Sequence, residues 1–243
     1  MLTKNEIKYI QSLFYKKQRD EEKLFAAEGP KLARELLDSQ LKLRHIYATA
    51  KWFENNGDVK VPATEISEME LSRISNLQTP HEVVIIAHQP SPENEPVLEG
   101  KLTIVLDGIQ DPGNMGTIVR IADWFGIQQI ICSSDCAEIY NPKVVQSTMG
   151  SILRVSCVYK DLNEWKQEKD MPVFGALLKG KNIYTLGKKK EGLIVIGNES
   201  KGIREPFKSK ITEPVTIPKA GGAESLNAAV ATGIIVGCLV NGH

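Results

Sequence analysis

The stretch TIVLDGIQDPGNMGTIVRIADWFGIQQIIC, residues 103–132, decides the fold class of this chain of 243 residues. Its first five residues and the QIIC at 129–132 are apolar runs typical of buried strands. Between them, Thr117–Phe125 has the apolar spacing of a helix. Asp111-Pro112-Gly113 is turn chemistry, because proline fixes φ and glycine accepts conformations that other residues avoid. Strand, helix and strand in this order predict a parallel sheet with crossover helices.

The same alternation continues to the end of the chain. We expect further strands at 173–177, 193–197 and 215–218, and helices at 142–149 and 225–240. Residues 101–243 are therefore predicted to form an α/β domain with a mostly parallel sheet and helices on both faces. Ligands of such sheets bind beyond the carboxyl ends of the strands.

Residues 1–88 are predicted to form a smaller α/β domain. We expect helices at 4–15, from Pro30 onward and at 67–75, and strands at 25–27, 43–49 and 82–88. Residues 89–100 are rich in proline and poor in large apolar side chains, which predicts an interdomain linker.

Charge and cysteine content exclude several classes of protein. Lys+Arg and Asp+Glu are both 30, which argues against a strongly electrostatic nucleic-acid binder. The four cysteines lack zinc-ligand spacing, so we expect reduced thiols and no metal. The N-terminus is too charged for a secretory signal, and the apolar run Ala228–Val240 is too short to span a bilayer. We therefore expect a cytoplasmic protein without membrane contact.

Three polar, glycine-containing loops follow predicted strands. They contain DPGNMGTIVR (111–120), GNESKGI (197–203) and IPKAGGAESLNAAV (217–230). Each loop alone would be read as a turn. On the residues alone, Ser225 also suits the N-cap of the last helix, and Arg120 could reach a core carboxylate or snorkel to solvent.

Together the loops resemble one family. N-x-G-x-x-x-R at 114–120, G-N-E-x-x-G-I at 197–203 and I-P-x-x-G-x-x-E-S-L-N at 217–227 resemble, in order and spacing, the motifs of the SpoU/TrmH RNA 2′-O-ribose methyltransferases of the SPOUT superfamily. YNPKVVQSTMG (140–150) is similar to a segment between the first two motifs. FAAEGPKLARELLDS (25–39) is similar to the family's substrate-binding domain.

The resemblance implies a C-terminal trefoil knot, S-adenosylmethionine as cofactor and a homodimer through the catalytic domain. Gly233 and Gly237 would permit close helix approach at that dimer interface. It also implies structured RNA as substrate, with large-subunit ribosomal RNA favoured over tRNA. The cofactor-binding residues implied are Leu177, Gly197, Ile217 and Leu226.

The catalytic residues implied by the resemblance are Arg120, Asn114, Glu199, Ser225 and Asn227. Because guanidinium stays protonated, we expect Arg120 to stabilise charge on the 2′-oxygen, or to act through a neighbouring phosphate, rather than to abstract a proton. Asn114 would shape the catalytic loop, and Glu199 with Asn198 would order the second loop. Ser225 and Asn227 would position the ribose or its phosphate.

Departures from the family pattern affect substrate choice more than catalysis. They are Ile121, Gln146, Ser200 and Lys219. One alternative is a catalytically inactive RNA-binding module, with Lys188–Lys190 as a phosphate contact. Another is an NTPase, since GALLKGKN (175–182) approaches a phosphate-binding loop, but Asn182 replaces the hydroxyl that would bind magnesium. A conventional Rossmann methyltransferase is disfavoured because no strand is followed by G-x-G-x-x-G.

Overall fold

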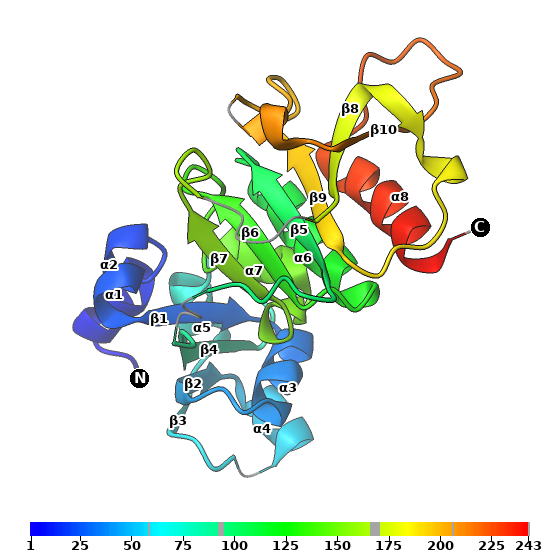
Figure 1. Ribbon diagram of the computed structural model, residues 1–243. Coiled ribbons are helices and arrows are strands. Elements are labelled where there is room, and N and C mark those ends of the chain that lie inside the picture. Colours follow the sequence, from blue (N-terminus) through cyan, green and yellow to red (C-terminus); the bar gives the residue numbers. More distant parts are fainter. Residues whose placement is uncertain (58, 92–94, 166–170, 206, 243) are drawn as a thin grey trace. The chain divides into compact units, whose positions relative to one another are not determined.

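The computed structural model describes residues 1–57, 59–91, 95–165, 171–205 and 207–242 (Figure 1). These residues form two compact units. The first comprises Met1–Ser91 with Glu138–Leu153, and the second comprises Pro92–Ala137 with Arg154–His243. The segment Glu138–Leu153 thus groups with the N-terminal part of the chain, although it lies inside the range 101–243 that the sequence assigns to one domain.

The first unit is built on a four-stranded sheet. Its elements are α1 (Lys4–Ser12), α2 (Lys16–Glu22), β1 (Leu24–Glu28), α3 (Pro30–Asp38), β2 (Leu43–Ala48), α4 (Ala50–Asn56), β3 (Ala63–Glu65), α5 (Glu68–Ile74), β4 (Val83–His88), α7 (Pro142–Thr148) and the 3-10 helix η1 (Ser151–Leu153). The strand order is β1-β4-β2-β3, with β1 and β2 antiparallel to β4 and β3 parallel to β2. Buried Ile10, Ile74 and Ile86 join α1 and α5 to this sheet.

Helix α7 belongs to this unit because it packs on β1. Val144 and Val145 of α7 are fully buried. Arg19 of α2 is also buried, pairs with the carboxylate of Glu138 and donates a 3.0 Å hydrogen bond to the carbonyl of Leu13. A buried guanidinium needs such partners to offset the loss of its hydration. The ion pair therefore holds Glu138, at the start of the segment that contains α7, against α2.

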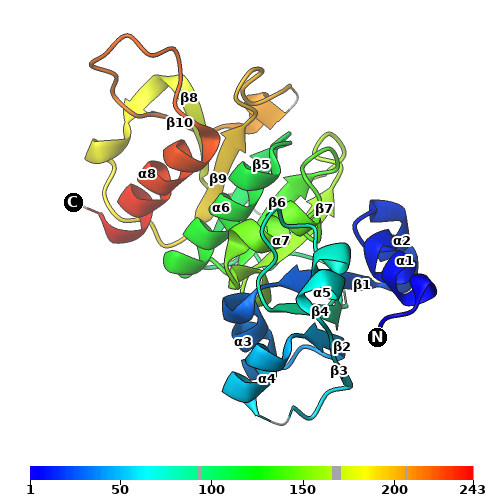
Figure 2. The same cartoon turned by 180° about the vertical axis from the view of Figure 1, so that it is seen from behind.

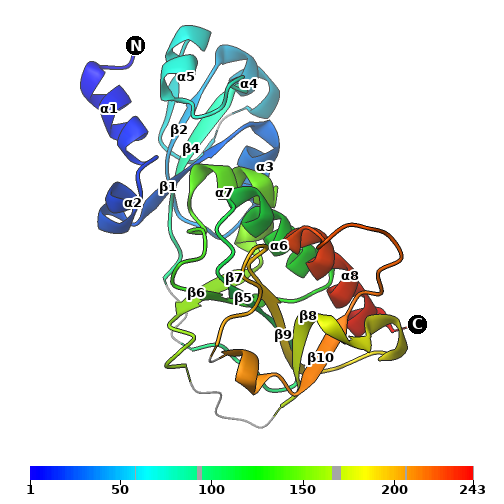
Figure 3. The same ribbon diagram turned by 90° about the horizontal axis from the view of Figure 1, so that it is seen from above.

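The second unit is built on a six-stranded sheet. Its elements are β5 (Leu102–Asp107), α6 (Pro112–Trp124), β6 (Gln129–Ser133), β7 (Ser156–Lys160), β8 (Val173–Asn182), η2 (Ile183–Thr185), β9 (Gly192–Gly197), η3 (Phe207–Lys210), β10 (Glu213–Thr216) and α8 (Ala228–Asn241). The order is β10-β8-β9-β5-β6-β7, and every neighbouring pair is parallel (Figure 3). The predicted α/β class with a mostly parallel sheet is confirmed.

Helices α6 and α8 pack against each other beside this sheet (Figure 2). A Cβ added to Gly233 would lie 3.6 Å from Ile121, and one added to Gly237 would lie 3.3 Å from Phe125. The two glycines therefore let α8 approach α6 of the same chain. The family resemblance implied that they permit close helix approach at a dimer interface, and within one copy they serve the packing of α8 on α6.

Another part of the sheet is covered by η3 and loops. Phe207 of η3 is buried in one apolar cluster with Val105 and Val195. Its ring stacks on that of Trp165, with the centroids 6.1 Å apart. This cluster keeps water from the sheet interior next to the strands whose ends carry the polar loops.

Some elements escaped the sequence patterns: α2, α4, β3 and β7. Helix α2 has the sequence KKQRDEE, so it offers no apolar periodicity to detect. Strand β3 is only three residues long.

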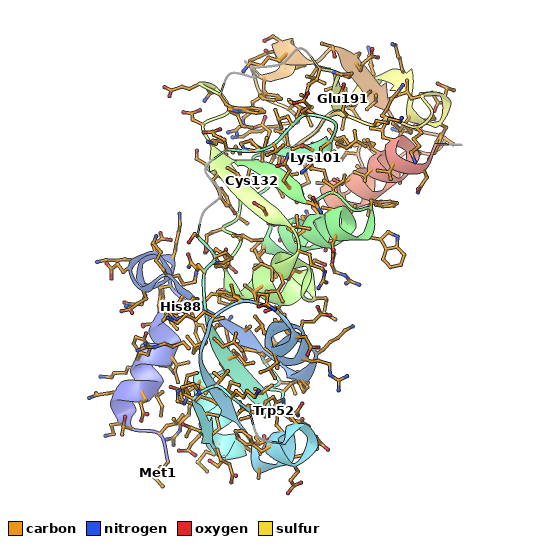
Figure 4. The ribbon with its side chains drawn as sticks, turned by 60° about the horizontal axis from the view of Figure 1, so that its bottom comes forward. Met1, Trp52, His88, Lys101, Cys132 and Glu191 are labelled. Atoms are coloured by element: carbon orange, nitrogen blue, oxygen red, sulfur yellow. The ribbon has the colours of Figure 1, made fainter. Side chains whose placement is uncertain are left out.

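The described part of the chain contains no helix that is long and apolar enough to cross a membrane. It also contains no group of three or more His, Cys, Asp or Glu side chains that could hold a metal ion. All four cysteines are free, and Cys132 lies in β6 of the parallel sheet (Figure 4).

Candidate active site at the carboxyl edge of the parallel sheet

A cavity of about 750 Å³ lies at the end of β9 and along the middle of β8. Its wall consists of the loop after β9, the segment from β10 to α8, and the first turns of α8. Six of the predicted site residues line it: Leu177, Gly197, Glu199, Ile217, Ser225 and Leu226. Its volume is within the range of small-molecule and cofactor sites, so these residues fit an organic cofactor.

One wall of the cavity arises from an irregularity in β8. Consecutive residues of β10, Pro214 and Val215, pair with Gly175 and Lys181 of β8. Residues 176–180 are therefore passed over by the ladder, and Leu177 lines the cavity from this bulge. The sequence predicted a strand that ends at 177. GALLKGKN is thus part of β8 and leads into η2, so it is not a phosphate loop before an α-helix.

A chain of amide side chains joins the three motifs. Nδ2 of Asn227 donates to Oδ1 of Asn114 at 2.8 Å. Nδ2 of Asn114 in turn donates to Oε1 of Glu199. Because each amide uses its oxygen toward one neighbour and its nitrogen toward the other, the chain fixes the orientation of both amides and of the carboxylate. Segments 85 and 113 residues apart in the sequence thus meet at one point.

Asn114 lies in the first turn of α6 and not in a loop. The helix begins at Pro112, and the carboxylate of Asp111 caps it by accepting the backbone N–H of Asn114 at 2.7 Å. The interpretation of Asp111-Pro112-Gly113 as a simple turn before a helix at Thr117 was wrong. Proline at the first helical position and aspartate before it are helix-start residues, and they override the turn signal.

Asn227, rather than Ser225, caps α8. Its Oδ1 accepts the backbone N–H groups of Ala229 and Val230 at 3.0 and 3.2 Å. The cap leaves Nδ2 available for the hydrogen bond to Asn114. Asn227 therefore holds a helix start and the amide chain together, while Ser225 lies upstream in the exposed segment that lines the cavity.

The loop after β9 is closed by its own backbone. Asn198 and Gly202 exchange two backbone hydrogen bonds of 3.2 and 2.8 Å. The side chain of Asn198 accepts the N–H groups of Ser200 and Lys201 and donates to the carbonyl of Gly108 at 2.8 Å. A Cβ on Gly197 would lie only 2.2 Å from the carbonyl carbon of Gly202, so the closed loop requires glycine there.

Arg120 is not brought to this cavity. It is exposed on α6 and is not among the lining residues. It lies six residues after Asn114, which places it about 240° around the helix and roughly 9 Å along the axis. Within one protein copy, Arg120 therefore does not lie beside the hydrogen-bonded side chains of Asn227, Asn114 and Glu199.

Several basic side chains around the cavity were not predicted as site residues from the sequence. They are Lys179, Lys201, Lys208 and Lys219, of which only Lys219 drew attention, as a departure from the family pattern. Lys201 lies inside the second motif and could have been found there. Lys179 could not, because the bulge that brings it to the cavity leaves no mark in the sequence.

A parallel sheet with a cofactor-sized cavity among glycine-containing loops at its carboxyl edge defines an α/β enzyme that binds a small organic cofactor. Residues 101–237 match the model of the SpoU rRNA Methylase family, and residues 4–85 match the MRM3-like substrate binding domain. The chain belongs to the SpoU rRNA methylase family.

Its relatives include proteins that are named as RNA methyltransferases. The chain is 28% identical over 235 residues to the 23S rRNA (guanosine(2553)-2′-O)-methyltransferase RlmP of Bacillus subtilis strain 168, covering 95% of this chain and 94% of that protein. A TrmH-family structure from Porphyromonas gingivalis has 38% identity and a TM-score of 0.86, with 98% and 97% of the two chains covered. An S-adenosylmethionine-bound rRNA methyltransferase from Sinorhizobium meliloti has 32% identity and a TM-score of 0.83, with 97% and 94% covered.

The expectations of a SpoU/TrmH enzyme and of S-adenosylmethionine as cofactor are confirmed. The alternative of a catalytically inactive RNA-binding module is not supported.

Proposed function

We propose that this protein transfers a methyl group from S-adenosylmethionine to a ribose 2′-hydroxyl of large-subunit ribosomal RNA, with tRNA as the second choice of substrate. The observation that carries the proposal is the hydrogen-bonded chain Asn227–Asn114–Glu199, which joins all three motifs beside the cavity. A relative that matches nearly the full chain is named a 23S rRNA methyltransferase, which favours ribosomal RNA over tRNA. Such a substrate also favours the cytoplasm as the site of action.

When bound, S-adenosylmethionine supplies an electrophilic methyl group on its sulfonium. We assign its binding to Leu177, Gly197, Ile217 and Leu226, all of which line the cavity. Gly197 lets the backbone come close, and the three apolar side chains suit the adenine and the methionine methylenes. The C-terminal trefoil knot expected from the family would place these loops around one ligand.

The chemistry assigned to the polar residues is alignment and charge stabilisation. A hydroxyl is a weak nucleophile, so it must be held in line with the methyl group while charge grows on its oxygen. Asn114 and Asn227 offer oriented amide groups, and Glu199 fixes their orientation. Ser225 offers a hydroxyl to the ribose or its phosphate from the exposed part of the wall.

We propose that Arg120 acts across a homodimer. The exposed surface of α6 carries Arg120 and Trp124, and Trp124 is 84% exposed. Val230 on α8 is 52% exposed. Large apolar side chains exposed on two packed helices fit an interface between two copies of the catalytic part. In such a dimer, Arg120 of one copy would serve the cavity of the other.

We assign RNA recognition to residues 1–88, a linker role to residues 89–100 and catalysis to residues 101–243. The match of residues 4–85 to a substrate-binding domain supports the first assignment. The segment Glu138–Leu153 lies inside the range 101–243 but groups with the first unit, so we assign α7 to the RNA-binding part and not to the catalytic part.

Methyl transfer from labelled S-adenosylmethionine to ribosomal RNA from cells that lack this protein tests the proposal. We expect incorporation that maps to one ribose 2′-oxygen in large-subunit RNA. Incorporation confined to tRNA would overturn the preferred substrate, and failure with both RNAs would overturn the activity.

Variants of Arg120 test its role in the same assay. We expect Arg120→Ala to lower turnover by roughly 10²–10³-fold while calorimetric binding of S-adenosylmethionine is kept, because Arg120 stabilises only developing charge. Arg120→Lys keeps the charge but loses the planar fork. If Arg120→Lys retained most of the turnover, the planar guanidinium would not be what Arg120 contributes.

A further inference from the structure

The loop that carries Glu199 leaves and rejoins the sheet at one point. Strand β9 ends at Gly197, which pairs with Asp107 at the end of β5. The loop ends at Arg204, whose backbone N–H donates a 2.7 Å hydrogen bond to Oδ2 of Asp107. Both ends of the loop therefore meet the same residue of the neighbouring strand.

The side chain of Arg204 strengthens this closure with charge. Its Nε donates to Oδ1 of Asp107 at 2.8 Å, and Nη2 contacts the same oxygen. Nη1 and Nη2 also reach the carboxylate of Asp135 at 2.9 and 3.0 Å. The Asp107 side chain is only 3% exposed. A buried carboxylate without a partner would be costly, so Asp107 and Arg204 depend on each other.

The carboxylate of Asp135, the second partner of Arg204, is also held in place. The hydroxyl of Ser133 donates to Asp135 at 2.6 Å and accepts the backbone N–H of Gly108 at 2.8 Å. Burial raises the pKa of Asp135, but hydrogen bonds from Ser133 and Arg204 outweigh it and hold this pKa below its usual range. Hydrogen bonds to Asp107 and Asp135 raise the pKa of Arg204. Asp135 and Arg204 are therefore charged at neutral pH.

Arg204 lies outside the cavity that its loop helps to form. Gly202 and Ile203 line the main cavity. Arg204 instead lines a separate hollow of about 230 Å³ together with Asp107 and Asp135. Its guanidinium is thus committed to carboxylates and has no place among the groups that would touch a cofactor.

We propose that Arg204 is a positioning residue for S-adenosylmethionine binding: it clamps the end of the loop 198–203 onto Asp107, so that Glu199 and the loop backbone keep their places in the cavity wall. Asn198 fixes the beginning of the loop through the carbonyl of Gly108. An arginine is needed because its fork bridges two carboxylates, whereas a lysine ammonium is a single point charge. The effect on the cofactor rests on the proposed function, but the clamp itself is a property of the fold.

Two variants of the full chain test the clamp by calorimetry with S-adenosylmethionine. We expect Arg204→Gln to raise Kd by about 10- to 100-fold, because a small misplacement of a binding wall weakens several contacts together. Arg204→Lys should fall between Arg204→Gln and the unaltered protein. The matched control is Lys101→Gln, which removes one exposed positive charge just before the amino end of β5 (Figure 4) and should leave Kd within about twofold.

A double variant separates positioning from charge neutralisation. Arg204→Gln alone leaves Asp107 buried without its guanidinium, so Tm should fall. Combining it with Asp107→Asn removes both charges, and Tm should recover while Kd stays high, since the bridge to Asp135 is still missing. Recovery of both Tm and Kd would overturn the positioning role.

Amide hydrogen exchange measures how firmly the loop 198–203 is held, and the measurement needs no cofactor. We expect the amides of Ser200, Lys201 and Gly202 to exchange faster in Arg204→Gln, while the amides of β5 keep their protection. If the unaltered protein fails to bind S-adenosylmethionine, the proposed function fails and the exchange result alone decides the clamp. Unchanged exchange in the loop of folded Arg204→Gln overturns the proposal.

Discussion

Two loops line the same cavity, and the chain holds them in opposite ways. The loop 197–204 is bonded to itself, to Gly108 and to Asp107. The segment 218–227 is exposed along its whole length. A Cβ added to Gly221 or Gly222 in that segment would meet no heavy atom within 4 Å.

The two loops therefore have different tasks in the binding site: the loop 197–204 is a fixed wall and the segment 218–227 is an open wall. The fixed wall presents Glu199 in one position before any ligand arrives, which keeps the cost of ordering low. The open wall carries Ser225 and Leu226 on backbone with few contacts, so it can adjust to a ligand but must be ordered by it. Substitutions at four positions probe this contrast, taken from the largest expected effect to the smallest.

Gly197→Ala should damage the fixed wall most. Its Cβ would lie 2.2 Å from the carbonyl carbon of Gly202 and 2.3 Å from the nitrogen of Ile203. Backbone cannot give way as a flexible side chain can, so we expect the free energy of unfolding to fall by about 3 kcal/mol. Urea denaturation measures this. An unfolding midpoint equal to that of the unaltered protein would mean that the loop is not held as tightly as its contacts indicate.

Glu199→Ala should mainly affect turnover. Asn114 would lose its charged acceptor, and the amide chain to Asn227 would lose its fixed orientation. A hydrogen bond to a charged group is worth about 1.5–3 kcal/mol, so turnover should fall roughly 10- to 150-fold. The matched variant Glu199→Gln keeps an acceptor oxygen and should retain more turnover than Glu199→Ala. Equal losses in the two variants would show that the chain to Asn114 is not what Glu199 contributes.

Asn227→Ala, at the end of the open wall, should cost about 1 kcal/mol of stability through loss of the α8 cap. Asn227→Asp separates the two tasks of this residue. A carboxylate still caps α8 but cannot donate to Asn114, so Tm should be kept while single-turnover methyl transfer slows. If Asn227→Asp turned over normally, the bond to Asn114 would have no part in catalysis.

Gly221→Ala should have the smallest effect. Nothing lies within 4 Å of the added Cβ, so we expect a change in unfolding free energy within about 0.5 kcal/mol. The same urea experiment that measures Gly197→Ala gives this value. A loss comparable to that of Gly197→Ala would mean that the open wall is packed after all, and the contrast between the loops would fail.

The sequence predicted the parallel sheet because its strands are almost wholly apolar. Strands β5, β6 and β9 are buried along nearly their full lengths, and such runs bounded by polar loops are easy to recognise. Helix starts were harder, because Asp111-Pro112-Gly113 satisfies both turn and helix-start rules. The helix-start rules decide the outcome, because the side chain of Asp111 accepts the backbone N–H of Asn114 and caps α6 from Pro112 onward.

The site was predicted in part. Leu177, Gly197, Glu199, Ile217, Ser225 and Leu226 all line the cavity. Arg120 does not line it, and it is exposed on α6 six residues after Asn114. The clamp of Arg204 on Asp107 could not be predicted either, since it joins residues 97 positions apart that meet only through the strand order β9-β5.

The grouping of Glu138–Leu153 with the first unit has a consequence for cutting the protein into pieces. The polypeptide leaves the first unit after Ser91, returns to it at Glu138 and leaves it again after Leu153. A fragment that starts at residue 101 would carry α7 without β1, and Val144 and Val145 would lose their apolar cover. In this fragment Glu138 would also lack its ion-pair partner Arg19. The two units therefore cannot be exchanged between proteins by a cut at one position. A chimaera that replaces either unit needs three junctions in the sequence.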